Sequence, residues 1–125
     1  MLRRDLTPHS CERFMELLPY HGTLLHARWS GEALWAPLGP AWPAGQYLPR
    51  EHATFEAKAG DILLYAGELS EPELLIPYGT SRFSCKAGLL EGNPVLTFDG
   101  SFSVLPELGR RALWRGAMSF RIEKP

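Results

Sequence analysis

Glycine and proline interrupt the apolar segments of this chain after only a few residues, so its regular elements must be short. Residues 22–30 alternate with the period of two that is typical of a β-strand. The alternation predicts one buried face, which includes Trp29, and a second face, which includes Arg28 and becomes polar toward the C-terminal end of the strand. Strands are expected at 22–30, 32–36, 52–57, 62–66, 73–76, 81–87, 95–98 and 118–122. Because closure hides the edges of short strands best, we predict a mostly β fold with two helices, built as a closed β-barrel of about eight strands.

One helix is expected near each end of the chain. Thr7 and Pro8 form a helix start, with a hydroxyl at the N-cap and proline at the first helical position, and Pro19 ends that helix. Ser103 can cap a second helix, which Gly116 ends and whose last turns carry arginines that complement the helix dipole.

The composition is that of a folded, nearly neutral protein. A length of 125 residues fits one domain, 1–125, and 45% hydrophobic with 22% charged residues argues against disorder. A formal net charge of −1 disfavours binding to nucleic acid or to an anionic membrane. No run approaches the ~20 apolar residues of a membrane span, and no apolar stretch of a signal peptide follows the first residues, so we expect a cytoplasmic protein.

Cysteines and histidines give no signal for a metal or a cofactor. Cys11 and Cys85 lie far apart in no motif, as is typical of reduced, small apolar residues. The four histidines make no metal-ligand spacing, and no glycine-rich phosphate loop occurs. We therefore expect no metal site.

The segment 37–49 is expected to be an irregular loop. Its four prolines lack amide donors, which makes a regular sheet improbable, and a long loop in a compact domain is often functional. Trp42 either docks on the body of the protein or offers an aromatic face to a ligand, and the sequence leaves both open.

Two segments concentrate the residues that could carry chemistry: His26, Arg28 and Glu32 in the first, and Glu73, Tyr78 and Arg82 in the second. An arginine can hold a substrate carboxylate, and a carboxylate or a tyrosine hydroxyl can move a proton. The same residue types also fit an ion pair at a barrel rim and a tyrosine packed in a turn. Gly92 and Asn93 are expected to form a turn.

These motifs resemble those of a known family. The segments 26–32 (HARWSGE), 60–65 (GDILLY), 77–79 (PYG) and 92–93 (GN) resemble small bacterial cyclophilin-like proteins, and the similarity runs from about Thr7 to Met118. The resemblance implies a cyclophilin-like closed barrel with flanking helices. That family is similar to the cyclophilin-like part of mikimopine and cucumopine synthases and to tryptophan-type Pictet–Spengler cyclases, which use no cofactor. The residue pattern of prolyl isomerases is not seen, so we do not expect that activity.

The resemblance implies a cofactor-independent enzyme of Pictet–Spengler type, which condenses a heteroaryl amino acid or amine with an aldehyde or 2-oxo acid. The expected roles are Glu32 as base with Glu73 or Tyr78 assisting, and His26, Arg28, Trp42 and Arg82 in substrate binding. The alternatives are a metabolite-binding or accessory module without catalysis, and a hydrolase or isomerase of cyclic amides. The expected partner is a small molecule with a carboxylate, and a homodimer is also expected.

Overall fold

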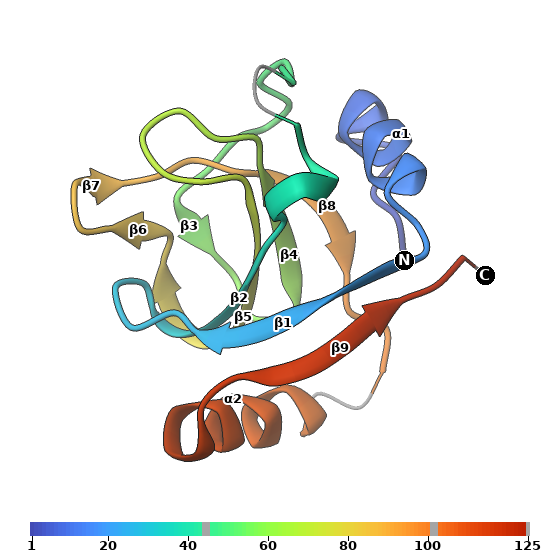
Figure 1. Cartoon of the computed structure of the whole chain (residues 1–125). Coiled ribbons are helices and arrows are strands. Elements are labelled where there is room, and N and C mark those ends of the chain that lie inside the picture. Colours follow the sequence, from blue (N-terminus) through green and yellow to red (C-terminus); the bar gives the residue numbers. More distant parts are fainter. Residues whose placement is uncertain (44–45, 101–102, 125) are drawn as a thin grey trace.

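A computed structural model describes residues 1–43, 46–100 and 103–124 as a twisted β-sheet with two α-helices (Figure 1). The elements are α1 (Pro8–Glu16), β1 (Tyr20–His26), β2 (Gly31–Pro37), η1 (Gly39–Ala41), β3 (Glu56–Ala57), β4 (Asp61–Tyr65), β5 (Glu73–Arg82), β6 (Ser84–Cys85), β7 (Gly88–Leu89), β8 (Asn93–Thr97), α2 (Val104–Arg115) and β9 (Met118–Ile122). The mostly β fold class with two helices is confirmed. Both helices begin where their capping residues predicted, and β9 has its expected bounds.

The main sheet is seven-stranded, with the order β8-β4-β5-β2-β1-β9, and β3 pairs with β5. β6 and β7 form a separate hairpin. All of these pairings are antiparallel. The two helices pack at different parts of the sheet, α1 on β8 and α2 on β1, β2 and β5 (Figure 1).

Among the described residues, no ladder joins β8 to β9 and closes the sheet into the predicted barrel. The N-terminal residues occupy the outer edge of β8 instead. Leu2 forms an antiparallel bridge with Leu96, and the backbone N–H of Thr97 donates to the Met1 carbonyl at 2.8 Å. These bonds use backbone groups that a closing strand would need, so the N-terminal segment protects this edge.

β5 passes through Pro77, whereas the sequence analysis ended a strand at Ile76; that prediction was wrong. Pro77 lies opposite Ala33, next to a register shift in the ladder between β2 and β5. An irregular ladder tolerates the missing amide of proline. β5 therefore continues to Arg82, and the strand expected at 81–87 is divided between the end of β5 and the short β6.

The sheet has a separate apolar core on each face. Leu34 and Ile76 belong to the core that the helices α1 and α2 also line. Leu75 and Phe83 belong to the second core, on the opposite face. Because neighbouring residues of a strand point to opposite faces, the register decides which residues of β2 and β5 can meet.

Candidate functional site

A pocket of about 490 Å³ opens on the face of the second core. Its walls are residues 26–30, Trp35, residues 69–71 with Glu73, and residues 84–87. Trp35 and Cys85 pack on the second core, which places the pocket on that face. The volume falls within the roughly 300–1,000 Å³ of sites for small molecules.

Glu73 is the buried titratable group of this pocket. It begins β5, lies opposite Tyr65 of β4, and is only 6% exposed. Burial raises the pKa of its carboxyl to about 7, and the negative charge of Glu71 acts in the same direction. No hydrogen bond or ion pair of this carboxylate occurs within the described part of the chain. A carboxyl that titrates near neutrality can both take up and return a proton there.

Arg28 and Trp29 lie in a turn and not in the strand that the alternation predicted. β1 ends at His26, and the backbone N–H of Ser30 donates to the Ala27 carbonyl at 3.0 Å. Trp29 is therefore 67% exposed instead of buried, because the alternation of β1 stops before it. The turn places Arg28 and Trp29 on the wall of the pocket.

The sequence analysis missed three further pocket residues, namely Trp35, Glu71 and Lys86. Sequence signals could have found two of them, Trp35 and Glu71, but not Lys86. Trp35 alternates with the buried Leu34 and so faces the other side of β2, and Glu71 lies two residues before Glu73. With these residues, the pocket walls carry two carboxylates, two cations and aromatic rings, which is the chemistry that a zwitterionic aromatic ligand needs.

His26 and Tyr78 form a hydrogen-bonded pair on the opposite face of the sheet. His26 Nε2 lies 2.7 Å from the Tyr78 hydroxyl. His26 pairs with Leu34 and Leu34 with Ile76, so the side chains of His26 and Tyr78 lie on the helix-covered face. Burial lowers the pKa of His26, with a further contribution from the charge of Arg28, and burial together with Glu32 raises the pKa of Tyr78.

Glu32 lies beside this pair and is not among the residues that line the pocket of about 490 Å³. Its Oε1 accepts a hydrogen bond from the backbone N–H of Thr80 at 2.9 Å. Gly79 leaves the space for this carboxylate, since a Cβ there would lie 2.7 Å from Oε1. None of the ion pairs in the described part joins Glu32 to Arg28. The structure thus brings Arg28 and Glu73 to one pocket, which His26 also lines, and places Glu32 beside Tyr78 on the helix-covered face.

Trp42 and Arg82 lie outside the pocket. Trp42 is only 2% exposed, the guanidinium of Arg13 lies 5.4 Å from its ring centroid, and its indole N–H donates to the Gln46 carbonyl at 3.1 Å. This is the docked arrangement that the sequence left open. Arg82 is exposed, and its guanidinium lies 5.7 Å from the ring centroid of Phe55. Their assignment to substrate binding stays a prediction that no contact in the pocket supports.

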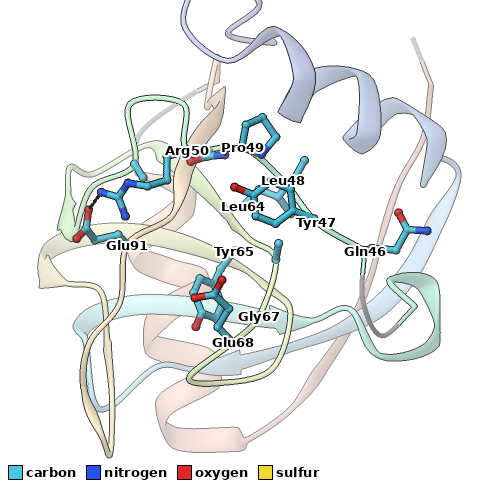
Figure 2. Close-up of a pocket in the computed structure, with 13 residues that line it drawn as sticks. Gln46, Tyr47, Leu48, Pro49, Arg50, Leu64, Tyr65, Gly67, Glu68 and Glu91 are labelled. Atoms are coloured by element: carbon cyan, nitrogen blue, oxygen red, sulfur yellow. Dashed lines mark hydrogen bonds and ion pairs between the residues drawn. The ribbon is translucent and has the colours of Figure 1, made fainter.

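A second hollow of about 440 Å³ lies beneath residues 46–53, as Figure 2 shows. Its charged wall is an ion pair between Arg50 and Glu91, and Tyr65, Gly67 and Glu68 group together at another side (Figure 2). Arg50 already has Glu91 as its partner, and its side chain is 69% exposed. We therefore take the Glu73 pocket, with its buried carboxyl, as the candidate site.

No group of three or more histidine, cysteine, aspartate or glutamate side chains is arranged to hold a metal ion in the described part. No helix among the described residues is long and apolar enough to cross a membrane.

The fold matches that of McbB, which has been solved in complex with tryptophan. The TM-score is 0.71 and the sequence identity is 21%, and the match covers 100% of this chain but 41% of the McbB chain. This chain thus spans less than half of McbB, and the likeness establishes the fold.

The chain belongs to the family described as "Protein of unknown function (DUF3830)", which matches residues 1–124. No match was found among curated proteins. The family match and the fold match together confirm the resemblance to cyclophilin-like proteins of unknown function that the sequence motifs indicated.

Proposed function

We propose that this chain is a cofactor-independent enzyme of Pictet–Spengler type, which condenses a heteroaryl amino acid or amine with an aldehyde or a 2-oxo acid. The observation that carries the proposal is the buried Glu73 carboxyl in a pocket walled by Arg28 and Trp35. The presence of tryptophan in the McbB complex supports the substrate class. The resemblance of the sequence motifs supports the reaction class.

Each wall of the pocket suits one part of such a substrate. Arg28 and Lys86 supply positive charge for a carboxylate, and the guanidinium can bind it with two parallel hydrogen bonds. Trp35, which is half-buried, offers an aromatic surface to the heteroaryl ring. Glu71 is exposed at the pocket and attracts the ammonium group of an incoming amino acid.

The reaction needs one group to move a proton. The amine and the carbonyl condense to an iminium ion with loss of water, a ring carbon attacks the iminium carbon, and a base then takes the proton of that ring carbon. We assign this last step to Glu73, since a pKa of about 7 leaves a substantial fraction of its carboxyl ionised near neutral pH. Holding both reactants together supplies much of the remaining acceleration.

Glu32 stays the second candidate for the base. Burial and the charge of Glu32 raise the pKa of Tyr78, whose hydroxyl contacts His26, so three groups that can carry a proton lie near one another on the helix-covered face. Glu32 is exposed and its carboxylate already accepts a hydrogen bond from the backbone, so it has no enclosed site in which to hold a substrate. For these reasons we place Glu73 first.

The test is to incubate the purified protein with tryptophan and a small 2-oxo acid and to measure masses. The proposal expects a product whose mass equals the sum of both substrates minus one water, at a rate above that of the substrates alone. Glu73→Gln should abolish the excess rate and Glu68→Gln, a change in the neighbouring hollow, should not. An absence of joined product over a panel of heteroaryl amines and carbonyl compounds contradicts the proposal.

A second candidate is a metabolite-binding module that uses the same pocket without catalysis. It is favoured by the McbB match, because that structure records a complex with tryptophan and so indicates binding. Binding of tryptophan that Arg28→Gln weakens, without any joined product, would select it. A product equal in mass to one cyclic amide plus water would instead select the hydrolase alternative. The predicted homodimer is tested separately by the sedimentation of the purified chain.

A further inference from the structure

We propose that Ser30 is a positioning residue that holds the turn of residues 27–30 so that Arg28 faces the pocket. The choice of ligand in the test rests on the proposed function. The positioning role of Ser30 rests on the hydrogen bonds of the turn, so this role and the proposed function can fail separately.

Ser30 joins the turn to the strands on the other side of the pocket wall. The residue is buried, with 7% of its surface exposed. Its hydroxyl donates to the Ser84 carbonyl at 3.2 Å and accepts from the Ser84 backbone N–H at 3.0 Å. Its carbonyl also accepts from the backbone N–H of Arg82 at 2.8 Å. One residue of the turn is therefore fixed by three hydrogen bonds to residues more than fifty positions away.

The carbonyl of Trp29, the residue directly after Arg28, is also bound by Ser84. The Ser84 hydroxyl lies 2.6 Å from the Trp29 carbonyl oxygen and 2.9 Å from that of Arg82. Before the turn, His26 is held by the Tyr78 hydroxyl. The turn is thus anchored on both sides of Arg28 by side chains that reach to or from the segment 78–84.

Arg28 depends on these anchors because its own side chain has none. It is exposed, and no hydrogen bond or ion pair of its guanidinium occurs in the described part. The backbone of the turn therefore fixes the point from which the Arg28 side chain extends toward the pocket. An error of about 1 Å in the placement of a binding group can cost a factor of about 100 in rate, so such a scaffold matters for function.

Replacing Ser30 by alanine removes the hydroxyl and leaves the partly buried N–H of Ser84 without its acceptor. Serine is thus needed at this position for its oxygen, and the small residue fits the buried site. Ser84→Ala is a milder change, since it removes only the contacts of the Ser84 hydroxyl to the two carbonyls. The two variants together separate a local effect on the turn from a general loss of stability.

The experiment measures the dissociation constants of L-tryptophan and tryptamine by calorimetry for the full chain. The variants are Ser30→Ala, Ser84→Ala, Arg28→Gln and the double variant Arg28→Gln/Ser30→Ala. Tryptamine lacks the carboxylate that Arg28 would hold. We expect Ser30→Ala to weaken tryptophan binding about tenfold, the size of one hydrogen-bond contribution, and tryptamine binding less than twofold. The double variant should bind tryptophan no more weakly than Arg28→Gln does.

Additive losses in the double variant, equal losses for both ligands, or unchanged tryptophan binding in Ser30→Ala would each overturn the proposal. If the unaltered chain binds neither ligand, the proposed function fails for indole substrates. The positioning claim is then decided by hydrogen exchange in the absence of a ligand. Ser30→Ala should speed the exchange of the Ser30 and Gly31 amides, which both donate to the Ala27 carbonyl, while Arg28→Gln should leave it unchanged. Equal exchange in all variants refutes the claim.

Discussion

His26 Nε2 and the Tyr78 hydroxyl lie 2.7 Å apart, and their contact passes over β2 on the helix-covered face of the sheet. It joins the end of β1 to the middle of β5, the two segments in which the sequence concentrates charged and aromatic residues. The pocket that contains Arg28 and Glu73 lies on the other face. One pair of segments thus builds a hydrogen-bonded anchor on one side of the sheet and a candidate site on the other.

The packing of α2 on Tyr78 predicts the effect of a small change in that helix. A Cβ at Gly109 would lie 2.3 Å from Cε1 of Tyr78, and the hydrogen bond to His26 restrains the ring from moving away. We expect Gly109→Ala to lower the free energy of unfolding by about 1–3 kcal/mol, although alanine is the better helix former. Chemical denaturation measures this change. The loss should largely disappear when Tyr78 is replaced by leucine, and an equal loss in that background contradicts the clash.

The raised pKa of Glu73 predicts how stability depends on pH. Its folded pKa of about 7 exceeds the reference value of 4.5, so the folded state binds more protons between these values. The contribution of this group is fully present below pH 4.5 and is lost as the pH rises through about 7. Compared with the unaltered chain, Glu73→Gln should therefore be more stable at pH 8 by about 1–2 kcal/mol, after allowance for partial solvent screening.

Unfolding free energies at pH 5, 6, 7 and 8 measure this difference between the two proteins. Glu68→Gln is the matched control, because Glu68 is an exposed carboxylate outside this pocket and does not contribute to the raised pKa of Glu73. A stability difference between Glu73→Gln and the unaltered chain that does not change with pH would show that Glu73 titrates as an ordinary surface carboxyl.

Glu51 predicts the opposite behaviour in acid. Its carboxylate accepts hydrogen bonds from the backbone N–H groups of His9 and Ser10 at 3.1 and 2.7 Å, so it caps α1. Burial tends to raise its pKa, but these bonds and that of the Ser10 hydroxyl outweigh burial and lower it. Its stabilising contribution is present above pH 4.5 and is lost as the pH falls through the lowered value.

Glu51→Gln should therefore destabilise the chain by about 1–2 kcal/mol at pH 7 and by less at pH 3. Thermal unfolding followed by circular dichroism at both pH values measures this effect. Glu12→Gln, an exposed change within α1, is the control. An equal effect of Glu51→Gln at the two pH values would contradict the capping role.

The sequence predicted elements whose ends are marked by local chemistry. Thr7 and Pro8 marked α1, and Gly116 marked the end of α2. The sequence did not predict the features that depend on a strand or segment far away in the chain. Pro77 lies inside β5 because β2 has an irregular register there. Among the described residues, the N-terminal segment and not a closing strand takes the edge of β8.

The candidate site shows the same division. Residue types alone singled out Arg28 and Glu73, which the structure brings to one pocket. They could not separate Glu73 from Glu32, because the face on which each lies depends on pairing between strands. The pocket wall of residues 84–87, which includes Lys86, belongs to a hairpin that follows β5 and that local patterns did not predict.

The central claim is that Glu73, in the pocket of Arg28 and Trp35, is the base of a condensation. The most direct measurement compares the rates of joined-product formation by Glu73→Gln and Glu32→Gln under single-turnover conditions. We predict that Glu73→Gln lowers the rate by about 10²–10⁴-fold, the usual contribution of a general base, and that Glu32→Gln stays within about tenfold of the unaltered chain. A Glu73→Gln variant that is as active as the unaltered chain would contradict the account.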